Sequence, residues 1–372
     1  MAATTRSVRD SLQRIQVRSD SPRLEQGESF DGLDIAWPTG LAPVPRAIDP
    51  APQPGDALPP ADVIVMVDTS AEAEAASDVL TPGCYYASHW YQYAKDFDTT
   101  FKPQLGPNAP ALESPYLGLY YLTEIAGLTA IVYKTNLHLH TDGKLLPDGS
   151  YTTPIKDMLA QMIGDAQPKV FLTTGTSGGV YCSMQLGDVA VTRGATFYCE
   201  QHYKSAPFNG QKYTSDWTLP DSHVAAAQQL MQGFAKNLTG KGTPPVADPS
   251  CNSSGQYPTN VYLDGTGDIA PFHPVITTDF FEFGTSTNDL DQMGIAVEMD
   301  DAMLGLVCQE LGAGAPHWAS VRNLSDPCIN GSLTPSQQSA CAEFFYSKYG
   351  YWTTVMSSIT AWALVAGLGA AS

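Results

Sequence analysis

The sequence predicts an α/β protein with a mixed, largely parallel central sheet flanked by helices. Short apolar, β-branched runs recur along the chain, and segments with helical spacing separate several of them. Strands that alternate with helices in this way are typical of such sheets. The chain has 372 residues, of which 43% are hydrophobic, and this is enough to build a substantial core.

Residues 1–60 are rich in Pro, Asp, Ser and Gly and are interpreted as an N-terminal extension. Eight prolines between residues 38 and 60 interrupt any periodicity. Whether this extension is loose or lies across the surface or a partner subunit stays open. No boundary or internal repeat follows, so residues 61–372 are predicted to form a single catalytic domain.

The predicted domain opens with a strand at residues 62–68 and a helix at residues 70–80. Further strands are expected at 128–135, 169–175, 188–198, 260–265 and 317–324, and further helices at 153–166, 222–238 and 297–311. Residues 351–372 are almost uncharged over a length that could span a membrane. Their Thr and Ser content favours a helix buried in the core or at a subunit interface.

Charge narrows the range of partners. The chain has 38 acidic and 19 basic residues and a formal net charge of -19, which repels nucleic-acid polymers and anionic membranes. A small neutral or weakly charged ligand is expected instead. Residues 1–16 lack the apolar segment of a signal peptide, so a cytoplasmic location is expected.

The seven cysteines are scattered, odd in number and without a CxxC pair. This pattern argues against a disulfide framework and against a metal site. Buried thiols are expected, because cytosolic thiols stay reduced. A pair between Cys328 and Cys341 is the alternative.

Two motifs offer groups that could hold a small ligand. The segment FLTTGTSGGV, residues 171–180, combines glycines with hydroxyls that could bind an oxyanion or a sugar hydroxyl, although a tight strand-to-helix turn would look similar. The segment VITTDFFEF, residues 275–283, places Phe280 and Phe281 beside Asp279. A planar base could stack on one ring, with core packing as the alternative.

Two further motifs carry carboxylates. In AVEMDDA, residues 296–302, Glu298 and Asp300 lie near a predicted helix start, where they could bind a ligand or cap the helix. In ASVRNLSDP, residues 319–327, Asp326 ends a predicted strand. Such ends are where α/β sheets bind ligands, although an aspartate before a proline also forms turns.

The order and separation of these motifs, with LGDVAV at 186–191, resemble the purine nucleoside phosphorylase and nucleosidase superfamily over about residues 61–330. The resemblance implies an enzyme that cleaves N-glycosidic bonds. It makes Asp326, after Ser325, the general acid that protonates N7 of a purine leaving group. It also implies a homo-oligomer and no cofactor. Whether phosphate is a co-substrate stays open.

The resemblance also assigns the substrate contacts. Glu298 and Met299 match the motif, whereas Asp300 replaces the family's ribose-binding glutamate. Phe281 matches the base-stacking aromatic, and the backbone of Glu282 would bind the purine edge. The hydroxyl residue at the phosphate or water site is matched by Thr176.

The phosphate or water site determines whether the nucleophile is water or phosphate. Thr173 stands where phosphate-using relatives place an arginine, which favours water. The resemblance then makes Glu72 the group that activates water, with Glu74 as the alternative. The leading hypothesis is a hydrolase acting on a purine nucleoside or thionucleoside. A phosphorylase using Arg193 or Arg322, and a repurposed biosynthetic or ligand-binding relative, stay open.

Overall fold

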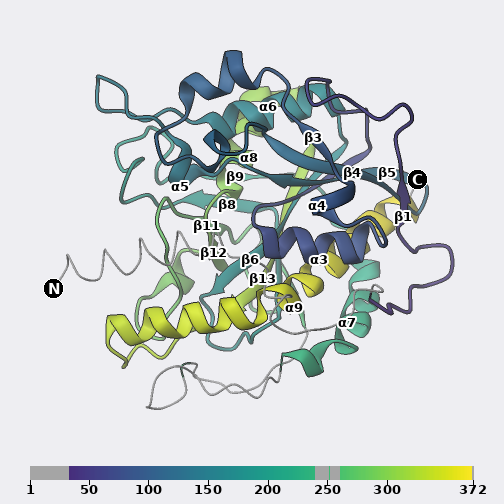
Figure 1. Ribbon diagram of the computed structural model, residues 1–372. Helices are drawn as coiled ribbons and strands as arrows, with labels where there is room; N and C mark the ends of the chain where they lie inside the picture. Colours follow the sequence, from purple (N-terminus) through teal and green to yellow (C-terminus); the bar gives the residue numbers. More distant parts are fainter. Residues whose placement is uncertain (1–32, 239–250, 252–259, 371–372) are drawn as a thin grey trace.

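The computed structural model describes residues 33–238, 251 and 260–370 and contains one continuous sheet (Figure 1). The strands are β1 (Val44–Arg46), β2 (Val63–Val67), β3 (Tyr91–Tyr93), β4 (Gly118–Ile125), β5 (Leu128–Thr135), β6 (Val170–Gly179), β7 (Val189–Thr192), β8 (Gly194–Phe197), β9 (Lys212–Thr214), β10 (Val261–Leu263), β11 (Val275–Thr277), β12 (Ala296–Glu298) and β13 (His317–Asp326). The helices are α3 (Ser70–Leu80), α4 (Tyr86–His89), α5 (Leu139–Asp142), α6 (Pro154–Ala166), α7 (Val224–Gln232), α8 (Asp301–Leu311) and α9 (Pro335–Ala370).

The sheet has the predicted fold class. Its main path runs β1, β4, β5, β2, β6, β12, β11, β8, β9, and β13 pairs with both β6 and β7. The central strands β5, β2, β6 and β13 are parallel to one another, while antiparallel pairs such as β4 with β5 lie further out. The prediction of a mixed sheet flanked by helices is therefore confirmed.

Helices cover both faces of this sheet (Figure 1). Helices α3, α7 and α9 pack on one face around a core that includes Val65 of β2 and Val321 of β13. Helices α6 and α8 pack on the other face around Ile64, Ile131 and Phe171. Successive residues of β2 thus serve different cores, because side chains alternate across a strand that is buried on both faces.

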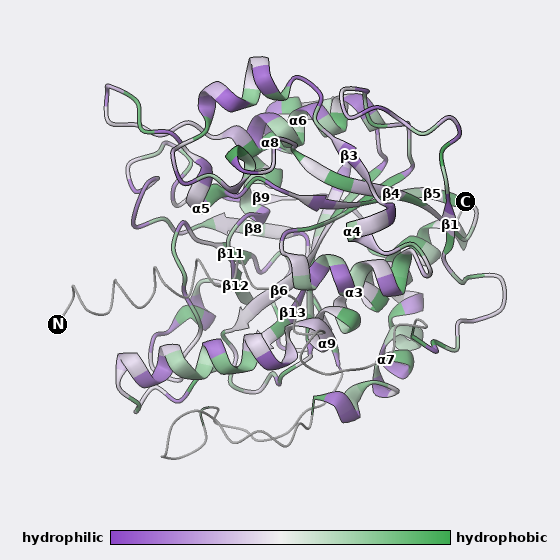
Figure 2. Cartoon of the chain, in the orientation of Figure 1, coloured by the Kyte–Doolittle hydropathy of each residue, from purple (hydrophilic) through white to green (hydrophobic). Residues whose placement is uncertain are grey.

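Helix α9 is the long apolar element of the C-terminal region. Its first turns alternate between hydrophilic and hydrophobic residues (Figure 2), whereas residues 349–367 are buried throughout. It is the one helix among the described residues that is long and apolar enough to cross a membrane, and 83% of its most apolar window is buried inside the chain. The fold accounts for this hydrophobicity through packing on α3, α7 and β13.

The described part of the N-terminal extension, residues 33–60, lies along the domain. Strand β1 pairs antiparallel with β4, and the Trp37 ring lies 4.6 Å, centroid to centroid, from that of Trp362 in α9. The Trp362 indole N–H donates to the Leu41 carbonyl at 2.6 Å. Residues 1–32 of the predicted extension lie outside the described residues.

Three expected elements differ in extent from the prediction. The helix expected at 297–311 begins at Asp301, because Ala296–Glu298 form strand β12. The run at 188–198 forms two strands, β7 and β8, which are separated at Arg193, and a Cβ at Gly194 would lie 2.5 Å from the Phe272 carbonyl oxygen. The helix expected at 222–238 is regular only over Val224–Gln232, and Gly233 follows its end. A Gly lowers helix stability, which explains the early end.

The cysteine prediction is wrong. The structure forms disulfides between Cys182 and Cys328 and between Cys251 and Cys341, which lie 146 and 90 residues apart in sequence. The fold, rather than local spacing, brings these thiols together, and Cys328 pairs with Cys182 instead of Cys341. Disulfides persist in oxidising compartments, whereas the cytoplasmic location stays a prediction from the sequence.

The pairing predicts a definite number of thiols. With two disulfides, the native chain retains three thiols, on Cys84, Cys199 and Cys308. Alkylation of the purified protein in denaturant without reductant, followed by mass spectrometry, should therefore modify three cysteines. The same experiment after reduction should modify all seven. Seven alkylated cysteines without reductant would show that the disulfides do not form.

Candidate active site

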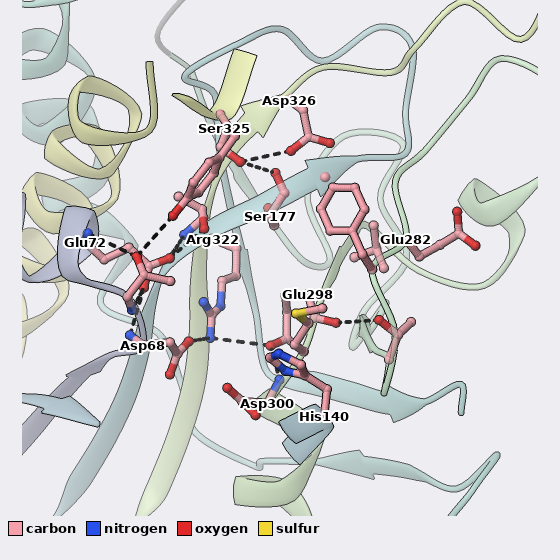
Figure 3. A pocket seen from close by; sticks show the side chains of 18 of the residues that line it. Asp68, Glu72, His140, Ser177, Glu282, Glu298, Asp300, Arg322, Ser325 and Asp326 are labelled. Carbon is pink, nitrogen blue, oxygen red and sulfur yellow. Dashed lines mark hydrogen bonds and ion pairs between the residues drawn. The ribbon is translucent and has the colours of Figure 1, made fainter. Parts of the chain in front are cut away.

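A cavity of about 610 Å³, counted out to its mouth, lies where the second half of β6 meets the ends of β12 and β13 and the segments after β2, β5 and β11 (Figure 3). The structure brings together in its wall all nine residues that the sequence proposed: Glu72, Thr176, Phe281, Glu282, Glu298, Met299, Asp300, Ser325 and Asp326.

The sheet opens at this point because β6 changes partners along one edge. Strand β2 pairs with Val170–Thr173 of β6, and β12 pairs with Gly178 and Gly179. The residues between these two stretches have no strand beside them on that edge, whereas β13 pairs along nearly the whole length of β6 on the other. The segment 171–180 is therefore a continuous strand, and the expected alternative of a strand-to-helix turn is wrong.

Glu72 joins helix α3 to this gap in the sheet. One oxygen of its carboxylate accepts from the backbone N–H groups of Asp68 and Thr69, both at 2.8 Å, as part of a capping box at the start of α3. The other accepts from the N–H and the hydroxyl of Thr176, at 2.7 and 2.6 Å. Four donors thus occupy this buried carboxylate. One of these donors is the backbone N–H of Thr176, in the part of β6 that no strand pairs with on this edge.

Gly175 makes this approach sterically possible. Its φ of 142° is one that residues with a side chain rarely adopt, and a Cβ there would lie 2.5 Å from the Glu72 carboxyl carbon. By register, Gly175 also lies between Arg322 on β13 and the position that follows β2, which is Asp68. The missing side chain leaves room for the Glu72 carboxylate beside β6.

Arg322 is the buried cation of the site. Its guanidinium donates to both carboxylate oxygens of Asp301, one of them at 2.9 Å from Nε, and to Asp68 at 3.0 Å, while Glu298 lies 3.5 Å away. Burial raises the pKa of the Asp68 carboxyl well above its usual range despite this partner. The expected structural ion pair of Arg322 is therefore present, and its donors point at protein carboxylates.

Glu298 and Asp300 both hold protein groups in place. The Glu298 carboxylate accepts from the N–H groups of Asp300 at 2.6 Å and Asp301 at 3.0 Å, and from the Thr277 hydroxyl, so it caps the start of α8. Asp300 accepts from the Leu139 N–H at 2.8 Å. The capping alternative is thus present for Glu298, and Asp300 reaches toward the segment after β5.

Asp326 lies at the other end of the cavity, above Ser325 and Ser177 in Figure 3. The Ser325 hydroxyl donates to its Oδ1 at 3.0 Å, while its Oδ2 has no hydrogen-bond partner among the described residues. The side chain is only 3% exposed. Burial raises the pKa of Asp326 to about 7. An acid that is half protonated near neutral pH, with one oxygen free, is suited to proton transfer.

The wall near Asp326 is aromatic. Phe281 is buried and its ring lies 5.7 Å, centroid to centroid, from that of Phe283. Glu282 is partly exposed, and its carboxylate accepts from the Phe283 N–H at 3.1 Å. Met299 is also partly buried and lines the cavity. A flat apolar ligand would find ring and thioether contacts here.

Sequence reasoning missed three polar residues of the wall: Asp68, His138 and His140. Each comes shortly after a parallel strand, β2 or β5, which is where α/β sheets place ligand-binding groups. The signal was therefore their position after an apolar run, as it was for Asp326. Tyr346 of α9, which also lines the cavity, carried no such signal because it lies within a helix.

Comparison with protein-family models finds no match, and comparison with curated proteins finds none. Among solved structures, the chain is similar to a 5′-methylthioadenosine/S-adenosylhomocysteine nucleosidase from Neisseria meningitidis in complex with methylthio-immucillin-A, at 13% identity and a TM-score of 0.46, covering 82% of this chain and 99% of that one.

Two other similar structures are a futalosine hydrolase of Helicobacter pylori and a 5′-methylthioadenosine nucleosidase of Arabidopsis thaliana. The first has 12% identity, a TM-score of 0.45 and coverage of 82% of this chain and 97% of that one. The second has 13% identity, a TM-score of 0.43 and coverage of 82% and 96%.

The contacts of Arg322 predict a large stability effect. Replacing it in Arg322→Met would leave the buried carboxylates of Asp68 and Asp301 without their cation, so the free energy of unfolding should fall by about 3–5 kcal/mol in denaturant titrations. Arg322→Lys should recover only part of this, because an ammonium cannot bind both oxygens of Asp301.

A matched control is Arg46→Met, since the pair that Arg46 forms with Glu124 is about half exposed. This change should cost less than about 1 kcal/mol. Equal stability of Arg322→Met and the wild-type protein would contradict the assigned role of the buried guanidinium.

Proposed function

We propose that this chain hydrolyses the N-glycosidic bond of a purine nucleoside or a related thionucleoside, with Asp326 as the general acid. The observation that carries the proposal is the buried Asp326 carboxyl, which has one unpartnered oxygen and a pKa raised to about 7. A purine anion is a poor leaving group until N7 accepts a proton. A carboxyl that keeps its proton near neutral pH can supply it.

The reaction balances as a hydrolysis. The bond between C1′ of the sugar and N9 of the base breaks, and its electron pair leaves with the base, whose N7 takes the proton of Asp326. The oxygen of a water molecule bonds to C1′, and the proton that water loses passes to a carboxylate. One nucleoside and one water thus give one free base and one free sugar.

The aromatic wall supports placing the base beside Asp326. Phe281 offers a ring face, and the backbone around Glu282 offers groups for the purine edge. The sugar would then extend toward Glu298 and Met299, where carboxylate and thioether groups line the cavity. This arrangement uses the contacts that the sequence resemblance implied.

Glu72 is proposed as the group that receives the proton of water. Its four acceptor positions are already occupied, so one donor must give way before water can bind to it. The Thr176 hydroxyl is the donor that can rotate without moving the backbone. Thr176 would thereby exchange its hydrogen bond with Glu72 for one with the incoming water.

Electrostatics favour water over phosphate as the nucleophile. The described residues that line the cavity include six acidic side chains and one arginine, Arg322, whose donors are held by Asp68 and Asp301. Arg193, the other candidate for phosphate, pairs with Asp264 and is not part of the wall. Lys134 interacts with Asp68 and Glu72 from outside the lining residues. A phosphate dianion would therefore find no unpaired arginine or lysine among the described residues of the wall.

Removing the acid tests the proposal. Asp326→Asn cannot donate a carboxyl proton, so base release from the cleaved nucleoside should fall by about 10²- to 10⁴-fold, measured by chromatography of the free base. The exposed Asp148→Asn is the matched control and should retain wild-type turnover. In the wild-type protein, kcat/KM should fall as pH rises through about 7, because Asp326 then loses its proton.

Unchanged turnover in Asp326→Asn would contradict the glycosidase mechanism. Saturable nucleoside binding by the wild-type protein without any base release would instead favour a ligand-binding relative.

A further inference from the structure

His140 is a polar side chain of the cavity wall that has no role in the proposed hydrolysis. Both of its ring nitrogens lack a hydrogen-bond partner among the described residues, and the side chain is only 5% exposed. Figure 3 shows it beside Asp300, at the end of the cavity away from Asp326. A buried imidazole with neither nitrogen bonded carries a desolvation cost that a ligand would remove.

Asp300 holds the segment that carries this imidazole. Its Oδ1 accepts from the Leu139 N–H at 2.8 Å, and its Oδ2 lies 3.3 Å from Nδ1 of His138. Asp142 closes the same turn by accepting from the His138 N–H at 2.5 Å. The backbone N–H groups of His138 and Leu139, just before His140, are thus both held by carboxylates.

These contacts leave Asp300 poorly placed to grip a pair of sugar hydroxyls. Both of its oxygens already bind protein groups, and its side chain is one carbon shorter than a glutamate. Burial alone would raise the pKa of Asp300, but hydrogen bonding and the charge of His138 lower it, so Asp300 stays ionised on its protein partners. Another group must then meet the sugar.

His140 has the chemistry for that contact. Burial, assisted by the neighbouring His138, lowers the pKa of His140 to about 3, so the ring is neutral across the working range of pH. A neutral imidazole offers one N–H donor and one nitrogen acceptor. A sugar hydroxyl is likewise both donor and acceptor, whereas a phosphate would meet the carboxylates of Asp300 and Glu298 nearby.

We propose that His140 recognises a hydroxyl of the substrate's sugar and that Asp300 is a positioning residue that holds His140 in the wall. This inference rests on the proposed nucleosidase function and narrows its substrate class to nucleosides without a phosphate at that hydroxyl. It also gives a physical reason for an aspartate at position 300: the carboxylate binds the chain instead of the ligand.

The test compares wild-type protein and His140→Phe on a parent nucleoside and its 2′-, 3′- and 5′-deoxy analogues. For one analogue, wild-type kcat/KM should fall about 10- to 100-fold below that of the parent, because a buried imidazole nitrogen is left unpaired. In His140→Phe the ratio of parent to that analogue should collapse to within about twofold. A merely structural role of His140 would slow all four substrates equally and leave the ratio unchanged.

Further variants guard against a folding defect. His140→Asn keeps a donor and an acceptor and should preserve part of the discrimination, and Asp300→Ala should reduce it because the segment is released. His317→Gln, at an exposed ring that pairs with Asp216, should behave as wild type. Thermal unfolding of each variant reports whether it is folded.

Two failures are distinguishable. If wild-type protein releases base but the ratios are the same in His140→Phe and His140→Asn as in wild type, the inference about His140 is overturned while the nucleosidase function stands. If wild-type protein releases no base from any nucleoside of the panel, the proposed function fails and this inference fails with it.

Discussion

The buried guanidinium of Arg322 is the interaction on which the rest of the site depends. It is the one arginine or lysine among the described residues of the cavity wall, and its donors bind Asp68 and Asp301. These contacts connect β13, the end of β2 and the start of α8, three elements that come from distant parts of the sequence. Since breaking a buried pair leaves an uncompensated charge, Arg322 fixes the geometry of the wall and is unavailable to a ligand.

Carboxylates elsewhere in the wall are mostly used for architecture. Glu72 caps α3 and ties it to β6, Glu298 caps α8, and Asp300 holds the turn after β5. Asp326 and Asp68 each keep one carboxyl oxygen without a hydrogen-bond partner among the described residues, and burial raises the pKa of both groups. Asp68 is bound to Arg322, whereas Asp326 lies at the aromatic wall, so Asp326 is the carboxyl placed to meet a planar base.

Much of this arrangement was predictable from local pattern. Asp326 ends an apolar run, and such runs identify the strands whose ends meet at a ligand site, so its place in the wall followed from the sequence. Glu298 and Asp300 were expected near a helix start, but whether they would bind the chain or a ligand depends on partners such as Leu139, far away in sequence. The motifs carried no information on that choice.

Other features depend on distance in space and left no local signal. The disulfides join cysteines 146 and 90 residues apart, so their spacing looked random. The sequence analysis did not predict strand β4. In the structure, β4 is joined to β5 by a tight hairpin at Ala126 and Gly127, whose φ values are 51° and 79°. His140 follows the apolar run of β5, but its burial without hydrogen-bond partners, which sets it apart, is visible only in the structure.

With its one arginine already paired to carboxylates, the described cavity wall is expected to admit a neutral nucleoside and water and to exclude phosphate. The most direct measurement is release of free base from a panel of purine nucleosides and thionucleosides with and without inorganic phosphate, followed by chromatography. Free base and free sugar should appear at a rate that phosphate does not increase. Base release that requires phosphate and yields a sugar phosphate would contradict it.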